Sequence, residues 1–351
     1  MDRLPYAWNG MKTRSTSLQP KGELDLLRQI RQRAPHGVAV VLGIGDDCAL
    51  LRARPEEEIA VTTDLSIDGR HFRLGWHPPE AVGHRALARG LSDLAAMGAR
   101  PLAAFVSLGL PQNLVKESGR ARSWVSRFYD GLLAMARAHH TPLAGGDLAQ
   151  ASLALADIVL VGAVPRGQAL LRSGARPGDQ IYVTGRLGGS AAGLARLAEI
   201  AAAAKPKAGS TLRMPRRWAA TLARHLYPQP RLAAGAWLRR HGTAAAAIDL
   251  SDGLSTDLAH LCEESGVAAE VDAAALPLAD GATLDHALHG GEDYELLFTA
   301  RPDRRVPRSV AGVAVTRIGR MIRARRGAPM MTLLTPEGQN PLEPRGWQHF
   351  V

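Results

Sequence analysis

Residues 43–51 read Gly-Ile-Gly-Asp-Asp-Cys-Ala-Leu-Leu, and residues 59–72 read Ile-Ala-Val-Thr-Thr-Asp-Leu-Ser-Ile-Asp-Gly-Arg-His-Phe. Each half follows a short apolar pattern typical of a β-strand, residues 38–42 and 59–61, that ends in carboxylates. Adjacent aspartates repel each other, so a packed turn tolerates them when a cation or backbone N–H groups neutralise their charge. Carboxylate and hydroxyl oxygens are the ligands that Mg²⁺ prefers. Taken alone, however, this stretch also fits ordinary solvent-exposed Asp-rich turns.

Three further segments combine glycine with carboxylates beside a predicted strand. They are residues 145–147 (Gly-Gly-Asp), 248–253 (Ile-Asp-Leu-Ser-Asp-Gly) and 290–295 (Gly-Gly-Glu-Asp-Tyr-Glu). Glycine permits close approach of the backbone to a ligand, and the carboxylates supply hard oxygen ligands. The repetition predicts that these segments surround one polyanion and its metal ions.

The composition fits a two-domain protein of the reducing cytoplasm. A chain of 351 residues with 46% hydrophobic residues can bury a substantial core, and no apolar run approaches the roughly 18 residues of a membrane span. Residues 1–22 are polar and basic, which predicts a disordered tail and no secretory signal. Cys48 and Cys262 have neither metal-binding nor redox spacing, which favours a cytoplasmic location over a disulfide scaffold.

The net charge of +10 raises the question of nucleic-acid binding. The arginines are scattered, and their one cluster, residues 320–326, contains no interleaved aromatic residue of the kind that binds single strands. Substrates with several phosphates are a sufficient partner for a basic protein, so we expect neither nucleic acid nor membrane as a partner. A basic nucleic-acid-binding protein remains a competing hypothesis, and it predicts that ATP and Mg²⁺ leave the thermal stability unchanged.

The hydrophobic periodicity predicts two α/β halves separated by a Gly-, Pro- and Arg-rich linker at residues 166–178. The predicted helices cover residues 23–33, 79–97, 115–139, 190–202, 231–240 and 255–264. The predicted strands cover residues 102–108, 153–164, 181–185, the segment before Asp249, 267–271 and 294–299. Residues 205–217 are expected to form a surface loop. Pro79 and Gly98 mark the start and stop of the second helix.

The sequence contains no Gly-x-x-x-x-Gly-Lys-Ser/Thr loop and no protein-kinase signature. Any use of ATP must therefore depend on metal ions and backbone N–H groups. Phosphoryl transfer permits this, because its catalysis is mostly positioning and charge neutralisation. No residue has the surroundings of an activated nucleophile, so we expect no covalent intermediate and no catalytic residue of that kind.

The ordered motifs at residues 43–51, 62–72, 91–99, 145–147, 249–253, 290–298 and 346–350 resemble those of the thiamine-monophosphate kinase family. This family belongs to the superfamily of aminoimidazole ribonucleotide synthetase and selenophosphate synthetase. The resemblance covers the chain from about residue 23 to its end. It implies a two-domain α/β (α+β) fold. Residues 23–165 would bind ATP and Mg²⁺ and form a β-barrel across a homodimer interface, and residues 166–351 would form an α+β domain that binds substrate and ATP.

The resemblance also implies a reaction and a set of site residues. ATP would phosphorylate thiamine monophosphate to thiamine diphosphate and release ADP, by direct in-line transfer assisted by several Mg²⁺ ions, with a role for K⁺ left open. Metal-site residues would be Asp47, Thr62, Thr63, Asp64, Asp93, Asp147, Asp249 and Asp252. ATP would contact Tyr129, Gly146, Asp147, Arg172 and Ser251, and the thiamine substrate would contact His71, Glu292 and Trp347.

Several of these residues have an ordinary structural explanation. Asp93 could lie on a solvated helix face, and His71 could simply end a strand. Tyr129 could occupy a core position beside Phe128, and Trp347 could also lie in the core. Ser251 and Asp252 could cap a helix, and Arg172 could be an ordinary surface residue. A Trp face also suits the thiazolium cation. Cys48 is expected to be a small buried residue.

Three positions depart from the family pattern. Asp68 stands where glutamate is usual, Arg70 where a small apolar residue is usual, and Gly90 where asparagine is common. These departures concern substrate detail more than the metal site. The alternative function is another ATP-using enzyme of the superfamily, acting on a ribonucleotide, selenide or a carbamoyl group. The sequence lacks the glycine-rich Cys or Lys loop of selenophosphate synthetases and the C-terminal cysteine of carbamoyl-dehydrating proteins.

Overall fold

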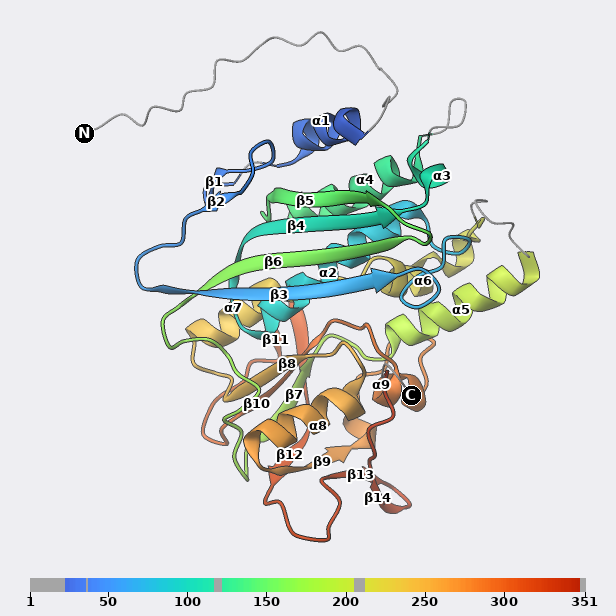
Figure 1. The fold of residues 1–351 in the computed structure, drawn as a ribbon. Coiled ribbons are helices and arrows are strands. Elements are labelled where there is room, and N and C mark those ends of the chain that lie inside the picture. The colour runs from blue at the N-terminus through green and yellow to red at the C-terminus, as the bar shows by residue number, and fades with distance from the viewer. Residues whose placement is uncertain (1–22, 36, 117–121, 205–211, 348–351) are drawn as a thin grey trace.

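The computed structural model describes residues 23–35, 37–116, 122–204 and 212–347, which form two large β-sheets, a third sheet of two short strands, and helices between and around the large sheets (Figure 1). The predicted tail at residues 1–22, much of the predicted surface loop at residues 205–217 and the end of the motif at residues 346–350 lie outside these ranges. No helix within them is long and apolar enough to cross a membrane.

The N-terminal half contains a four-stranded sheet in the order β3-β6-β4-β5. Only β4 and β5 run parallel; the other neighbours are antiparallel. The strands are β3 (Glu57–Ile67), β6 (Leu155–Pro165), β4 (Arg100–Leu110) and β5 (Leu143–Gln150), and a small hairpin joins β1 (Val40–Leu42) to β2 (Leu50–Leu51). The helices are α1 (Glu23–Arg33), α2 (Pro79–Ala96), α3 (Gln112–Val115) and α4 (Trp124–Ala138).

Helix α2 occupies the centre of the molecule, between the N-terminal sheet and the C-terminal half (Figure 1). Pro79 fits the first helical turn, which needs no N–H donor there, and Gly98 ends the helix with a left-handed φ of +64°. The helix packs against α4 at very short range: a Cβ on Gly83 would lie 2.0 Å from the Phe128 carbonyl oxygen. Glycine is therefore required where the two helices cross.

The C-terminal half contains an eight-stranded sheet with the order β14-β13-β9-β12-β7-β10-β8 and with β11 paired to β12. The strands are β7 (Gln180–Thr184), β8 (Ala246–Asp249), β9 (Ala268–Asp272), β10 (Leu296–Ala300), β11 (Ser309–Val310), β12 (Val313–Ile322), β13 (Met331–Thr335) and β14 (Gly338–Pro341). The α-helices are α5 (Gly189–Ala204), α6 (Ala219–Leu226), α7 (Leu232–Arg240), α8 (Leu254–Ser265) and α9 (Leu284–His289). Two 3₁₀ turns lie at Arg216–Trp218 and Ala273–Ala275.

Most predicted elements are present, and several boundaries are corrected. The helix predicted at residues 115–139 begins at Trp124, because Ser123 caps it through its hydroxyl. Strand β3 does not end before the carboxylates but continues to Ile67, since eleven residues pair with β6. Likewise, residues 145–147 lie within β5. The sequence did not reveal α3, α6, α9, β2 or the strands β11 to β14, which are short or have weak periodicity.

One further expectation differs from the structure, and one is not tested by it. Cys48 is exposed and only Cys262 is buried, so the expectation of a buried Cys48 is wrong. The four-stranded N-terminal sheet does not close on itself among the described residues. Its outer face carries the exposed side chains of Ile59, Val61 and Leu65 on the edge strand β3. The mixed two-domain architecture is as expected, while the barrel across an interface stays a prediction.

Candidate active site

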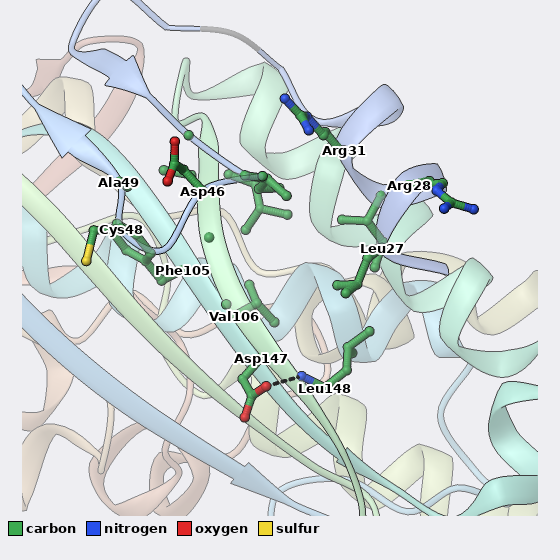
Figure 2. Close-up of a pocket in the computed structure, with 18 of the residues that line it drawn as sticks. Leu27, Arg28, Arg31, Asp46, Cys48, Ala49, Phe105, Val106, Asp147 and Leu148 are labelled. Atoms are coloured by element: carbon green, nitrogen blue, oxygen red, sulfur yellow. Dashed lines mark hydrogen bonds between the residues drawn. The ribbon is translucent and has the colours of Figure 1, made fainter. Parts of the chain in front are cut away.

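A cavity of about 590 Å³ lies between α1, the loop at residues 43–49 and strands β4 and β5 (Figure 2). It brings together the predicted residues Asp47, Tyr129, Gly146 and Asp147, which come from three separate parts of the chain. Other residues that line it include Arg28, Arg31, Gly43, Asp46, Phe105 and Leu148. The cavity thus combines a glycine-rich backbone, carboxylates and two arginines, a set suited to a nucleotide and its metal ions.

The floor of this cavity explains the Gly-Gly-Asp motif. Gly146 has a φ of +147°, and a Cβ there would lie 1.9 Å from the Val106 carbonyl oxygen of β4. Glycine at this position lets β5 pair closely with β4 and presents Asp147 at the surface. Asp147 accepts a hydrogen bond from the Leu148 N–H at 2.8 Å (Figure 2).

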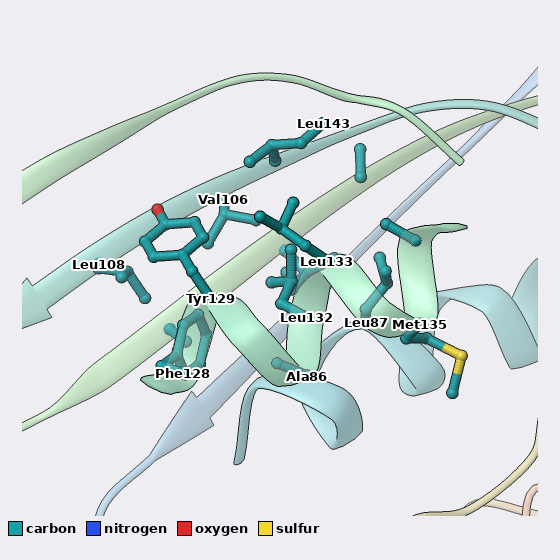
Figure 3. Close-up of a cluster of buried hydrophobic side chains, with 14 of the residues drawn as sticks. Ala86, Leu87, Val106, Leu108, Phe128, Tyr129, Leu132, Leu133, Met135 and Leu143 are labelled. Carbon is teal, nitrogen blue, oxygen red and sulfur yellow. The ribbon is translucent and has the colours of Figure 1, made fainter. Parts of the chain in front are cut away.

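Tyr129 combines a core position with a place in the cavity lining. Its side chain is 3% exposed, and its ring meets Phe128 edge to face at 5.6 Å between centroids (Figure 3). Burial raises the pKa of its phenol, so the group is a neutral donor and acceptor. The core interpretation is therefore correct in part, since the same residue also lines the cavity.

A second group of predicted residues forms a carboxylate cluster where α2 meets both sheets. The Thr62 hydroxyl of β3 donates to the Asp93 carboxylate of α2. Ser92, fully buried one residue earlier, donates to Asp249 at the end of β8 at 2.7 Å. Asp64, two residues after Thr62 on the same face of β3, pairs with Arg89 at 3.3 Å.

The cluster concentrates negative charge in a poorly solvated place. Burial raises the pKa of Asp64 to about 6, although Arg89 acts in the opposite direction. Burial also raises the pKa of Asp93 and raises that of Asp249 to about 7, with a further contribution from the neighbouring Asp93 charge. Carboxylates held together at this cost are candidate ligands for cations.

Among the described residues, no three His, Cys, Asp or Glu side chains gather closely enough to form a complete metal site. Mg²⁺ is usually bound by one or two carboxylates together with waters and oxygens from substrate phosphates. The oxygen donors of the cluster match that chemistry. Thr63 is the exception, since its side chain is exposed on the opposite face of β3 from Thr62 and Asp64.

A third group surrounds Arg85, which the sequence analysis did not select. Its buried guanidinium donates to Glu292 at 2.6 Å and to the His71 carbonyl oxygen at 3.2 Å, and so joins two of the residues predicted to hold substrate. Burial alone raises the pKa of Glu292, but the charge and hydrogen bond of Arg85, together with His225 and Arg89, outweigh this effect and hold the pKa at about 2. The carboxylate is therefore ionised at every physiological pH.

Two buried histidines support Arg85. His225 of α6 contacts the Arg85 guanidinium through Nδ1 at 3.1 Å, and its Nε2 lies 3.0 Å from the Nε2 of His77. Burial lowers the pKa of His77 to about 3, and it also lowers that of His225. Both rings are therefore neutral, and one donates to the other.

The loop at residues 290–295 directs its three carboxylates to different partners. Glu292, with a left-handed φ of +66°, faces Arg85, while Asp293 accepts from the Ser190 N–H at the start of α5. Glu295 accepts from Thr184 at 2.7 Å and from Arg231. The contacts of Asp293 and Glu295 thus hold the loop in place. They keep Glu292 in a backbone conformation that is unfavourable for a non-glycine residue.

The segment 249–253 links this loop to the end of the chain. The Ser251 carbonyl accepts from the Glu292 N–H at 2.7 Å, and the Asp252 carbonyl accepts from the Trp347 N–H at 3.0 Å. The side chains of Ser251 and Asp252 do not cap α8; instead Asp257 accepts from the N–H groups of residues 251–253. Trp347 is 46% exposed, which excludes the core position considered for it.

The remaining positions, which are Arg172 and the three departures from the family pattern, make fewer contacts with the groups described above. Arg172 is exposed, but its charge acts on Asp93 and Asp249, where it lowers the pKa of both. Asp68 accepts from the Leu74 N–H and so shapes the turn after β3, while Arg70 is exposed. A Cβ on Gly90 would meet the Leu160 side chain at 2.6 Å, so glycine allows close packing of α2 on β6.

Sequence reasoning missed Arg85, Arg89, Ser92 and Asp257. One signal was available: Arg85, Arg89 and Asp93 recur every four residues on a predicted helix, which places them on one face.

Comparison with known proteins identifies the family of the chain. Residues 45–164 match the model of the AIR synthase related protein N-terminal domain, and residues 176–331 match that of the C-terminal domain. Thiamine-monophosphate kinase of Salmonella typhimurium is 41% identical over 313 residues, which cover 86% of this chain and 90% of the relative. That of Escherichia coli K12 is 39% identical over 343 residues, covering 94% and 98%.

Solved structures give the same result. The crystal structure of thiamine-monophosphate kinase from Stenotrophomonas maltophilia K279a superposes with a TM-score of 0.72 at 39% identity, covering 86% of this chain and 94% of that chain. AaThiL complexed with AMPPCP and TMP gives 0.70 at 30% identity, covering 96% and 100%. The fold and the two matching domain models place the chain among the AIR synthase related proteins. Within that class it belongs to the thiamine-monophosphate kinase family.

Proposed function

We propose that the protein transfers the terminal phosphate of ATP to thiamine monophosphate, giving thiamine diphosphate and ADP. Family membership over nearly the whole chain supports the reaction. Within this chain, the main structural support is the carboxylate cluster of Asp64, Asp93 and Asp249. Residues from both halves of the chain form this cluster around α2. A basic nucleic-acid-binding protein would have no use for such a buried acidic cluster.

The donor and acceptor sides occupy different places. ATP would lie in the cavity beside Tyr129 and Gly146, where backbone and carboxylates converge. Thiamine monophosphate would lie between His71, Glu292 and Trp347, with its cationic ring near the ionised Glu292 and the exposed indole. The remaining nucleotide contacts, Arg172 and Ser251, would approach from the C-terminal half.

The metal-site residues would be Asp47, Thr62, Asp64, Asp93, Asp147, Asp249 and Asp252, with Thr63 taking part only through its backbone. Mg²⁺ bound there would neutralise the charge of the two phosphate-bearing substrates. Ser92 holds Asp249 in place, and Thr62 orients Asp93. K⁺ is an additional candidate ligand.

We assign residues 23–165 to ATP binding, Mg²⁺ binding and dimerisation, and residues 166–351 to substrate and nucleotide binding. The exposed face of β3 supports a homodimer, since Ile59, Val61 and Leu65 are 52%, 61% and 44% exposed on an edge strand. Two such faces would complete the expected barrel. Analytical ultracentrifugation of the wild type and of Val61→Asp tests this interface by measuring the oligomeric state. We expect a wild-type dimer and a monomeric Val61→Asp variant, and a monomeric wild type would refute the interface.

The reaction is tested by incubating the purified chain with ATP, Mg²⁺ and thiamine monophosphate and separating the products by chromatography. We expect ADP and thiamine diphosphate in equal amounts, and neither product when thiamine monophosphate is left out. Binding of ATP without formation of thiamine diphosphate would refute the proposal. Ribonucleotide and selenide acceptors would then be tried.

A further inference from the structure

Helix α2 carries a row of three charged side chains, Arg85, Arg89 and Asp93, at intervals of four residues. Because an α-helix rises 1.5 Å per residue with 3.6 residues per turn, neighbouring members of the row lie about 6 Å apart along one face. Each contacts a different partner: Arg85 pairs with Glu292, Arg89 with Asp64, and Asp93 accepts from Thr62. The row therefore runs from the proposed acceptor site to the carboxylate cluster.

Arg89 stands in the middle of this row. Its side chain is 18% exposed, and its ion pair with Asp64 is long, at 3.3 Å between Nη2 and Oδ1. An arginine guanidinium stays charged at every physiological pH. A guanidinium has five N–H donors, and Asp64 is the only ion-pair partner of Arg89 among the described residues. Most of its donor capacity is therefore available to a ligand.

This position coincides with the path of the transferred group, if the proposed function is correct. In-line transfer requires the terminal phosphate of ATP, held at the cluster, to face the phosphate of the acceptor, held beside Glu292 and His71. The centre of the row lies between these two places. We propose that Arg89 is a catalytic residue that donates hydrogen bonds to the phosphoryl group during its transfer.

In this step the bond between the γ phosphorus and the β–γ bridging oxygen breaks, and its electron pair leaves with ADP. A phosphate oxygen of thiamine monophosphate forms the new bond to the same phosphorus. Arg89 keeps its protons throughout and contributes only charge and hydrogen bonds. A planar guanidinium suits the equatorial oxygens of this group better than an ammonium does, because it donates two parallel hydrogen bonds.

The competing interpretation is that Arg89 only neutralises Asp64. The two interpretations predict different kinetics. If Arg89 is only a counter-charge, its removal frees Asp64 for metal binding, so the apparent affinity for Mg²⁺ rises and kcat is retained. If Arg89 contacts the transferred group, kcat falls even at saturating Mg²⁺, while the KM for ATP changes little.

The test compares Arg89→Met and Arg89→Lys with the control Arg100→Met, which removes an arginine paired with Glu57 away from the cluster. Steady-state kinetics at saturating Mg²⁺ and thermal unfolding are measured for each variant. We expect Arg89→Met to lower kcat roughly 10²–10³-fold with the KM for ATP within about threefold of wild type. Arg89→Lys should recover part of this loss, and guanidinium ion added to folded Arg89→Met should restore some of the rate.

A folded Arg89→Met variant with wild-type kcat, or with unchanged kcat and tighter Mg²⁺ binding, would overturn the inference. If Arg89→Met does not fold, Arg89→Lys decides: we expect at least a roughly tenfold lower kcat, and an undiminished kcat overturns the inference. The wild-type control separates this inference from the proposed function. Wild-type enzyme that makes no thiamine diphosphate refutes both, whereas active wild type with active variants refutes only the role of Arg89.

Discussion

Replacing Arg85 with methionine should destabilise the protein and weaken the acceptor site. Arg85 has a side chain that is 5% exposed, and it is the partner that keeps Glu292 ionised. Methionine preserves much of the buried apolar stem but leaves the Glu292 carboxylate without its counter-charge. His225 and the His71 carbonyl also lose a donor.

The magnitude follows from the pKa of Glu292. The fall from an ordinary value of 4.5 to about 2 corresponds to roughly 3 kcal/mol of the free energy of unfolding at neutral pH. Loss of one partner of a buried ion pair typically costs about 3–5 kcal/mol, which agrees. For a chain of this length, about 3 kcal/mol corresponds to a fall in Tm of roughly 4 °C.

The pH dependence has a defined sign. Because folding lowers the pKa of Glu292, the stabilisation is complete well above pH 4.5 and is lost as the pH falls towards about 2. The stability difference between wild type and Arg85→Met should therefore shrink from roughly 3 kcal/mol at pH 7 to roughly 2 kcal/mol at pH 3.5.

Urea unfolding at both pH values, with wild type, Arg85→Met, Glu292→Gln and the double variant, measures this coupling directly. Arg100→Met serves as the control for an exposed ion pair, and it should change stability by less than about 1 kcal/mol. The KM for thiamine monophosphate should rise in Arg85→Met while that for ATP stays constant. A stability loss below about 1 kcal/mol at pH 7, or a coupling energy near zero, would refute the account of Arg85.

Three further outcomes are expected. Asp64→Asn should lower kcat by at least roughly 10²-fold without unfolding the protein, because it removes a proposed metal ligand; an active, folded variant would reject that assignment. Trp347→Ala should raise the KM for thiamine monophosphate roughly tenfold and leave that for ATP unchanged, as loss of a cation–π contact predicts; the reverse pattern would exclude Trp347 from the acceptor site. In EDTA, stability should fall as the pH rises from about 5 to 8, since folding raises the pKa of Asp64 to about 6 and that of Asp249 to about 7, and the folded state loses these protons only at higher pH. Between pH 5 and pH 8, Asp64 alone would contribute roughly 1.5 kcal/mol to this fall. ATP with Mg²⁺ should flatten the profile, and a flat profile in EDTA would contradict the cluster's electrostatics.

Much of the fold follows from local sequence. Helix α2 lies within one residue of its predicted limits, because Pro79 and Gly98 act on the backbone directly and need no distant partner. The prediction for residues 115–139 was too long, since hydrophobic spacing does not reveal that Ser123 caps a later start. The extent of β3 was also underestimated, because its pairing with β6 determines where it ends.

The sequence by itself determined the family and the segments proposed to carry the chemistry, namely the carboxylates beside glycines and the ordered motifs. Only the tertiary structure decided which of them meet. Ser92 and Asp249 are 157 residues apart, and Arg85 and Glu292 are 207 apart, so their contacts depend on how α2 packs between two sheets. The same packing turns Thr62 and Asp64 inward and leaves Thr63 outside. Alternation along a strand separates neighbouring residues by face, but only the helix packed on the sheet determines which face becomes the site.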